Sequence, residues 1–322
     1  MKYAIISDIH GNSYAFNAVL EDAKTQNVDK YLLLGDYTTN YSQGNDVMNA
    51  IRKLRPVLAV RGNNDNYIVD LRNKDRSEWV HEQLKPMYWA FQNLSPENIR
   101  LLANMPATAK ISDGDFNINL ASTMKLFYRL PEIELFDPRH FRALMASNPF
   151  SHDEYLLFAK AIFLSCPGVL EDVLSLPEGI YLYGHNHLQF HMEYEGRLFI
   201  NPGSCGDSLN WDTRAAYTIL TLNNNRWDVN ERRVEYDTQL VADDMDASGF
   251  TEYNPVFSEI LKMQVRSAKD FLGPFIMHVM KKGQENGETV MPVSNKTLEE
   301  AVRTWDFRRA VDARSTLAGV GY

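Results

Sequence analysis

Side chains that bind divalent metals recur at the ends of apolar segments in this chain. They are carboxylates, carboxamides and imidazoles, and each group closes a short apolar run: Asp8, His10, Asp36, Asn63, Asn64, His185 and His187. Asp8 and His10 lie two residues apart, so both point to the same side if the extended backbone persists that far. A carboxylate and an imidazole that converge make half of a divalent-metal site. The sequence therefore predicts metal chemistry at several strand ends.

The first third of the chain predicts the elements that position these side chains. Apolar runs at residues 3–6, 30–36 and 56–65 alternate with two amphipathic helices, the second around residues 46–54. The first helix, capped by Ser13, should bury four residues at helical spacing: Phe16, Val19, Leu20 and Ala23. This alternation favours a mostly parallel sheet with helices outside. In such sheets ligands gather beyond the carboxyl ends of the strands.

Two later blocks are expected to be helical insertions. Residues 66–105 are aromatic-rich and broken by prolines, which predicts short helices. Residues 125–176 return to helical periodicity, with Asp137 as a helix cap. Both blocks could cover the site or only pack against it. Between them we expect a hairpin that turns at Asp113 and Gly114.

The second half of the core predicts further hairpins. Turns are expected at Glu195 and Gly196 and at residues 223–225, so this sheet should be largely antiparallel or mixed. We divide the chain into a core at residues 1–242 and a helical C-terminal appendage at residues 243–322.

The appendage shows two helical patterns with a polar stretch between them. Residues 255–280 are amphipathic, and residues 281–295 are polar and marked by glycine and proline, which indicates a loop or hinge. Thr297 and Glu300 fit a capping box before a final helix. This appendage is a candidate surface for oligomer assembly.

Composition limits the class of protein. The chain has 322 residues, of which 44% are apolar, and a formal net charge of −9. Negative charge disfavours a non-specific grip on nucleic acid. Cys166 and Cys205 make no disulfide framework, and no apolar run reaches the roughly 20 residues that span a membrane. We therefore expect a cytoplasmic protein with neither a membrane nor a nucleic-acid partner.

The ordered motifs resemble those of the calcineurin-like metallophosphoesterases, in particular a small prokaryotic branch. That branch has Asp-x-His-Gly-Asn near the start and Asn-Pro-Gly-Ser after Gly-His-x-His, and the resemblance covers roughly residues 1–240. It implies an α+β fold, a four-layer α-β-β-α sandwich with two metal ions above the strand ends. Carried over by position, the resemblance implies that Asp8, His10 and His187 hold one ion. It implies that Asn63 and His185 hold the second ion and that Asp36 bridges both.

The ligand chemistry suits the metals that the resemblance implies. A mixed shell of imidazole, carboxylate and amide favours Mn or Fe, with Zn or Co as alternatives, over Ca. Two such ions about 3.5–4 Å apart lower the pKa of a bridging water and hold phosphoryl oxygens for in-line attack by hydroxide.

Two positions depart from the family pattern. Where relatives place a further histidine ligand after a strand, this chain has Ser122. A neutral hydroxyl is a poorer ligand, so the second site should be weaker, or be completed by water or by another histidine. The available histidines are His140, His152 and His191.

The second departure is Asn64, where many relatives carry a histidine that helps to protonate the leaving group. An amide can bind a phosphate oxygen but cannot act as a general acid. We therefore expect good leaving groups, such as phosphoanhydrides or activated aryl diesters, to be favoured over alkyl monoesters.

Several nearby residues allow two interpretations each. Asn12 could contact phosphate or tighten a turn, and Arg61 could reach a substrate oxygen or form a structural ion pair. Asp65 is expected to orient a neighbouring ligand. The aromatic side chains of residues 88–91 could stack on a base or belong to the core. Cys205 lies close to the expected site and is given no catalytic role.

The leading hypothesis is a metal-dependent phosphodiesterase or nucleotide phosphoanhydride hydrolase that uses a metal-bound hydroxide. One branch of the family with a similar helical extension looks like a dinucleoside polyphosphate hydrolase, so the small phosphorylated substrate could be a nucleotide. The alternative is a non-catalytic metal-binding protein with a degraded second site, in which the helical extension mediates assembly. Ser122 is the main argument for this alternative.

Overall fold

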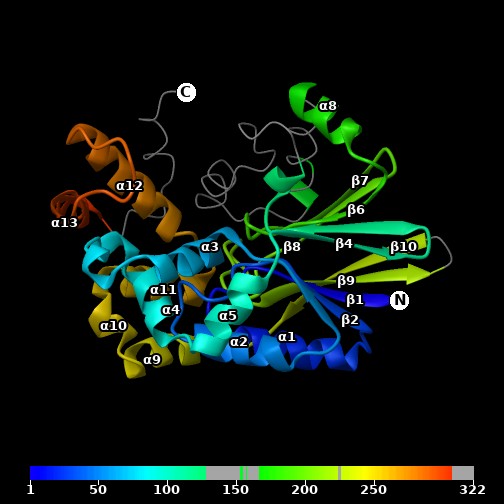
Figure 1. The fold of residues 1–322 in the computed structure, drawn as a ribbon, viewed down its shortest axis with the longest axis horizontal. Helices are drawn as coiled ribbons and strands as arrows, with labels where there is room; N and C mark the ends of the chain where they lie inside the picture. The colour runs from blue at the N-terminus through cyan, green and yellow to red at the C-terminus, as the bar shows by residue number, and fades with distance from the viewer. Residues whose placement is uncertain (128–152, 155–156, 158–166, 224–225, 307–322) are drawn as a thin grey trace.

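Two five-stranded mixed sheets face each other, with helices on their outer faces (Figure 1). The structure is a computed structural model that describes residues 1–127, 153–154, 157, 167–223 and 226–306. One sheet has the order β10-β9-β1-β2-β3 and the other β4-β5-β6-β8-β7. The predicted α+β sandwich and the mixed character of its sheets are confirmed.

The first sheet combines parallel and antiparallel pairs. It contains β1 (Lys2–Ile6), β2 (Lys30–Leu33), β3 (Val57–Ala59), β9 (Ala215–Asn223) and β10 (Arg226–Val234). The second contains β4 (Thr108–Asp113), β5 (Phe116–Ala121), β6 (Gly179–Leu182), β7 (Gln189–Tyr194) and β8 (Arg197–Pro202). Strands β1, β2 and β3 run parallel, so their carboxyl ends meet at one edge of the sheet.

The helices before the second sheet lie outside the first one or close its end. They are α1 (Ser13–Thr25), α2 (Gly44–Lys53), α3 (Asn63–Asp70), α4 (Lys85–Asn93) and α5 (Pro96–Asn104). Short 3-10 turns, η1 (Leu71–Asn73), η2 (Arg76–Glu78) and η3 (Glu82–Leu84), connect α3 to α4. The prediction of short helices over residues 66–105 is therefore confirmed.

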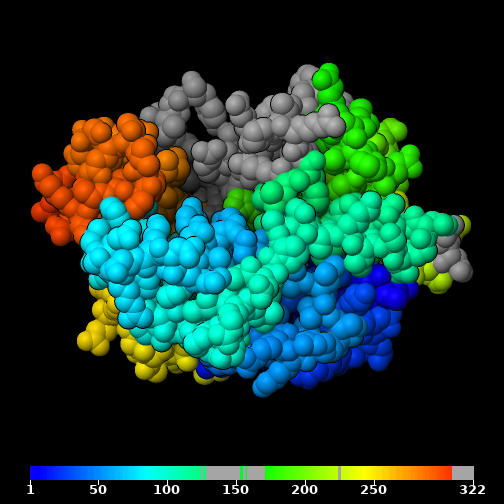
Figure 2. Space-filling model, viewed as in Figure 1, coloured from blue at the N-terminus to red at the C-terminus, as the bar shows by residue number. Residues whose placement is uncertain are grey.

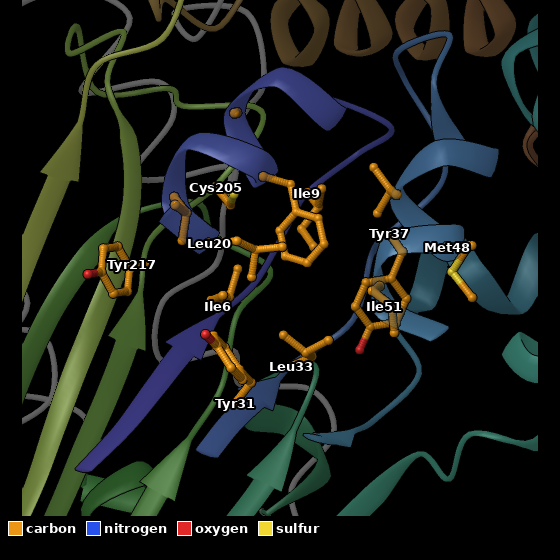
Figure 3. Close-up of a cluster of buried hydrophobic side chains, with 14 of the residues drawn as sticks. Ile6, Ile9, Leu20, Tyr31, Leu33, Tyr37, Met48, Ile51, Cys205 and Tyr217 are labelled. Carbon is orange, nitrogen blue, oxygen red and sulfur yellow. The ribbon is translucent and has the colours of Figure 1, made fainter. Parts of the chain in front are cut away.

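Strand β1 shows why the layers stack as they do. Its side chains alternate between the two faces of the sheet. Ala4 and Ile6 pack against α1 and α2 in one buried cluster (Figure 3), whereas Tyr3 and Ile5 face the second sheet in another. Because its residues from Tyr3 to Ile6 are all buried and largely apolar, this strand contributes to two cores at once.

The first helix buries the predicted face but starts one residue earlier than expected. Phe16, Val19, Leu20 and Ala23 are all buried, as predicted. The prediction of Ser13 as the cap is wrong, because the Asn12 side chain accepts the hydrogen bond from the Ala15 N–H at 3.0 Å. The Ser13 hydroxyl instead donates to Gln43 at 2.7 Å.

Hairpin turns lie close to their predicted places. The β7–β8 turn falls at Glu195 and Gly196, as expected. In the β4–β5 hairpin Asp113 pairs with Phe116, so the turn is one residue later than predicted. The predicted Asp137 cap lies outside the described residues. The described elements that precede and follow it in the chain are η4 (Met124–Leu126) and α8 (Pro167–Ser175).

The C-terminal part forms a helical layer beside the sheets, drawn in gold and orange in Figure 1. It contains α9 (Thr238–Ala247), α10 (Phe250–Tyr253), α11 (Pro255–Ser267), α12 (Leu272–Glu285) and α13 (Asn295–Thr304). The predicted boundary after residue 242 falls inside α9, and the division into two units stays a prediction. No described helix is long and apolar enough to cross a membrane.

Two predictions in this layer are wrong in detail. Ser294, not Thr297, caps α13, because its hydroxyl accepts the Thr297 N–H at 3.3 Å. The predicted loop at residues 281–295 is shorter, since α12 continues to Glu285.

An ion pair joins α1 to the first sheet and gives a test of its stability. Asp22 accepts two hydrogen bonds from Arg232 of β10, at 2.7 and 2.9 Å, and one from the Tyr217 hydroxyl. The Arg232 bond lowers the pKa of Asp22, so the charged form stabilises the fold above the unfolded pKa of about 4 and this contribution is lost as pH falls below it. We expect Asp22→Asn to lower the free energy of unfolding by about 1 kcal/mol near neutral pH. Denaturant titrations should show the difference shrinking in acid.

The matched control is Glu21→Gln, one residue away. Glu21 pairs with Lys24 on the exposed face of the same helix, where its side chain is 72% exposed. Its replacement should change stability by only a few tenths of a kcal/mol. Equal effects of the two substitutions at every pH would contradict the assignment.

Candidate metal centre

Four loops converge where the strands end. Backbone hydrogen bonds join the first two loops, since the Asp8 N–H donates to the Gly35 carbonyl at 3.1 Å and the His10 N–H to the Asp36 carbonyl at 2.9 Å. The loop after β6 comes from the second sheet and docks through the His185 N–H, which donates to the Asp8 carboxylate at 3.1 and 3.2 Å. Residues from both sheets therefore share one site.

Asp8, His10 and His187 form the first group. One ligand atom from each lies within 4.8 Å of the others, and all three side chains are buried. The Nε2 atoms of His10 and His187 are 3.1 Å apart. Asp8 Oδ1 lies 3.9 Å from His10 Nε2 and 3.5 Å from His187 Nε2. His187 Nδ1 donates to the Asp207 carbonyl at 2.6 Å, so Nε2 is the unprotonated nitrogen of the neutral ring, the form that binds metal. The group fits a divalent ion.

Asp36, Asn63 and His185 form the second group. One atom of the Asn63 amide lies 3.0 Å from His185 Nδ1 and 3.2 Å from Asp36 Oδ2. If that atom is nitrogen, it donates a hydrogen bond to both. If it is oxygen, three metal-binding atoms converge, an arrangement that a cation between them would stabilise. This donor set also fits a divalent ion.

The backbone at this edge adopts an uncommon conformation. Five of the six residues in the two groups have positive φ angles, between 52° and 78°: Asp8, His10, Asp36, His185 and His187. For residues other than glycine this conformation costs about 1–2 kcal/mol each, and such strain clusters at functional sites. We expected Asp8 and His10 to converge because the extended backbone of the strand persists that far, and this expectation is wrong. They meet because each turns into the left-handed region, not because the strand continues.

Asp65 holds the loop that carries Asp36. Its buried carboxylate accepts the N–H groups of Asp36 at 2.8 Å, Gly62 at 3.0 Å and Tyr37 at 3.0 Å. Burial, with the Asp36 charge nearby, raises the pKa of Asp65 to about 7. An orienting role for Asp65 stays a prediction, and these contacts give its physical basis.

Asn64 lies between Asp36 and a cavity. Its N–H and its amide nitrogen both donate to the Asp36 carboxylate, at 2.9 and 3.1 Å. The residue also lines the cavity beside the two groups. A contact with phosphate stays a prediction.

Asn12 and Arg61, the other two candidates for substrate contacts, form hydrogen bonds to other groups of the protein. Asn12 is fully buried, caps α1 and donates to the Gly206 carbonyl at 2.8 Å, as the turn-tightening alternative required. Arg61 donates a hydrogen bond to the Ala103 carbonyl at 3.0 Å, and this bond is not an ion pair. Arg61 is not among the described residues that line the cavity. No described contact supports a substrate role for either residue.

Ser122 stands at the end of β5, beside the loop that follows β6. Its carbonyl accepts the Gly184 N–H at 3.2 Å, so it occupies the position from which a histidine ligand was expected. His191 is half-exposed and bonds Glu231 at 2.7 Å. His140 and His152 lie outside the described residues.

Asp207 and Gln264 belong to no motif that would single them out from the sequence. Besides its carbonyl bond to His187, Asp207 accepts the Tyr41 hydroxyl at 2.8 Å and the Gln264 amide of α11 at 2.7 Å. Gln264 is buried, and its oxygen accepts two N–H groups at the start of α12. This chain of bonds ties the helical layer to His187.

We expect Gln264→Leu to weaken binding of one Mn²⁺ by about tenfold, because residues behind a metal ligand set its orientation. Isothermal titration with Mn²⁺ would measure this. The control is Gln239→Leu, an exposed glutamine on α9, which should leave the affinity unchanged. Unaltered affinity in a folded Gln264→Leu protein would show that Gln264 does not influence metal binding.

A cavity of about 570 Å³ opens beside both groups. Its described lining joins His10, Asp36, Asn63, His185 and His187 to side chains of α3, α4, α11 and α12. Such a volume suits a small-molecule substrate.

The α+β sandwich carries two adjoining groups of side chains that could bind metal ions at the ends of its strands. Residues 1–225 match the calcineurin-like phosphoesterase superfamily domain, and the chain belongs to this family. Membership supports a metal-dependent phosphoester hydrolase that acts on small phosphorylated substrates.

Relatives agree on the fold. An uncharacterised protein of Methanocaldococcus jannaschii, MJ0912, is 26% identical over 250 residues, which cover 73% of this chain and 87% of that protein. A metallophosphoesterase from Sphaerobacter thermophilus superposes with a TM-score of 0.58 at 22% identity, covering 83% of this chain and 99% of that one. The hypothetical protein PH1004 from Pyrococcus horikoshii gives 0.57 at 18% identity, with 81% and 97% covered.

Proposed function

We propose that this chain is a dinuclear phosphoesterase that cleaves phosphodiesters or nucleotide phosphoanhydrides. Asp8, His10 and His187 hold one divalent ion, Asn63 and His185 hold the second, and Asp36 binds both. The observation that carries the proposal is the convergence of these six side chains beside one cavity. Mn or Fe is our expectation for the ions.

The bound ions would supply an activated water and neutralise charge on the phosphoryl oxygens. The protein's own residues position the reactants. Asp65 fixes the Asp36 loop, and the Asp207 carbonyl fixes the His187 ring. Asn64 lines the cavity, where it could bind a phosphate oxygen, but it supplies no proton, so leaving groups that depart as stable anions should be favoured.

Elemental analysis combined with hydrolysis of bis(p-nitrophenyl) phosphate in added Mn²⁺ tests this proposal. Two ions per chain with turnover support it. One ion or none, with no turnover under any divalent metal, would favour the alternative of a metal-binding regulatory protein.

The main argument for that alternative is Ser122, which leaves the second group one imidazole short of the family pattern. Cytoplasmic location and assembly through the C-terminal helices also stay predictions.

A further inference from the structure

The cavity beside the candidate metal centre has two chemically different halves. One half is made by the metal-binding side chains. The other half is apolar and is contributed largely by α4, α11, α12 and the loop before α13: Leu84, Pro86, Met87, Phe257, Leu261, Leu272, Ile276, Met291 and Pro292. Figure 2 shows the orange C-terminal helices beside the cyan segment that follows β3, and the Glu82 N–H donates to Asn295 at 2.9 Å across this contact.

Three polar side chains of the lining are engaged within the protein, and Tyr67 and Lys74 also line the cavity. Gln83 accepts the Val293 N–H at 3.1 Å and directs its amide nitrogen at the Met291 sulfur. Gln264 bonds Asp207 and the two N–H groups at the start of α12. Asn40 donates to Asp207 at 3.0 Å. Among the described residues, Tyr67 and Lys74 are therefore the polar side chains of the lining that could meet the polar edge of a nucleobase, apart from those beside the metal-binding side chains.

Charged side chains are few on the described lining. Lys74 is the one lysine or arginine of the described lining, and the carboxylates of that lining are Asp36 and Asp207, both beside the metal-binding side chains. An anionic phosphate would thus be placed at the ions, with an uncharged group extending away from it.

We propose that the substrate carries an apolar substituent on its phosphorus, an aryl group or a hydrocarbon chain, and that the wall formed by α4, α11 and α12 binds it. This inference rests on the proposed phosphoesterase function and narrows its substrate class. Burial of such a group gains free energy in proportion to its apolar area, whereas a base loses water from polar atoms that find few partners here. The C-terminal helical layer thereby selects the substrate.

A series of diesters with one common leaving group tests the proposal. The Mn²⁺-loaded full chain would be assayed with p-nitrophenyl phosphodiesters whose second substituent is methyl, phenyl, octyl or 5′-thymidyl. Because p-nitrophenolate leaves in every case, differences in kcat/KM report on the second substituent. We expect the phenyl and octyl esters to exceed the methyl ester by about tenfold or more. The thymidyl ester should not exceed the methyl ester.

Two neighbouring residues of α12 give a matched pair of variants. Ile276 lines the cavity, while Met277 has a comparable partial exposure on the same helix and does not. Ile276→Ser should lower kcat/KM for the octyl ester several-fold more than it lowers kcat/KM for the methyl ester. Met277→Ser should change neither.

A binding measurement separates this inference from the function on which it rests. Calorimetric titration with n-octylphosphonate and methylphosphonate, with and without Mn²⁺, reports on the apolar wall without turnover. Tighter binding of octylphosphonate by about tenfold, lost in Ile276→Ser, supports the inference even if no diester is cleaved. Equal binding of the two phosphonates, or a preference for the thymidyl ester, overturns it and leaves the phosphoesterase proposal intact.

Discussion

Asp36→Asn is expected to lower metal-dependent turnover by about a thousandfold, equivalent to about 4 kcal/mol of transition-state stabilisation. The Asp36 carboxylate lies beside Asn63 and accepts two hydrogen bonds from Asn64. We expect it to be the group that binds both ions. Asparagine keeps the shape of the side chain but removes the charge that two adjacent cations require. Steady-state kinetics with bis(p-nitrophenyl) phosphate would measure the loss, and elemental analysis should show fewer than two ions per chain.

The control for this substitution is Asp70→Asn. Asp70 is an exposed carboxylate at the end of α3, away from the cavity lining. It should keep both the activity and the metal content of the parent protein. Full activity of a folded Asp36→Asn protein would show that Asp36 does not bridge the ions.

Asn64→His is expected to raise turnover of alkyl phosphodiesters by about a hundredfold, the usual contribution of a positioned general acid. Asn64 lines the cavity and contacts Asp36, so an imidazole at this position would lie beside the scissile phosphate. The parent protein has no titratable group at residue 64, and its rate should depend steeply on the pKa of the leaving group. In the variant this dependence should flatten, while activated aryl diesters change little.

A plot of log kcat/KM against leaving-group pKa measures both slopes. Asn64→Gln serves as the control, because it keeps an amide and should keep the steep slope. If the parent protein cleaves a simple alkyl phosphomonoester as fast as an activated diester, the argument from Asn64 is wrong.

The sequence was sufficient to predict which loops would meet. Candidate metal ligands closed four apolar strands, and the carboxyl ends of parallel strands share an edge. The sequence therefore placed Asp8, Asp36 and Asn63 correctly relative to the sheet. The left-handed backbone at Asp8 and His10 was not predictable from the pattern. It arises from hydrogen bonds to the neighbouring loop after β2, which local spacing does not encode.

Helix ends and the cavity wall depend on contacts remote in sequence. Asn12 and Ser13 are both good caps, and the choice between them follows from the bonds of Ser13 to Gln43 and of Asn12 to Gly206. The amphipathic patterns of α11 and α12 predicted buried faces but not the surface they would cover. Gln264 meets Asp207 at a separation of 57 residues, and no local pattern predicts that pairing.

The most direct test of the account is an anomalous difference map from crystals of the full chain loaded with Mn²⁺. We predict two peaks, one among Asp8, His10 and His187 and the other beside Asn63 and His185, with Asp36 between them. A map with no peak, or with a single ion that Asp36 does not touch, would contradict the central claim.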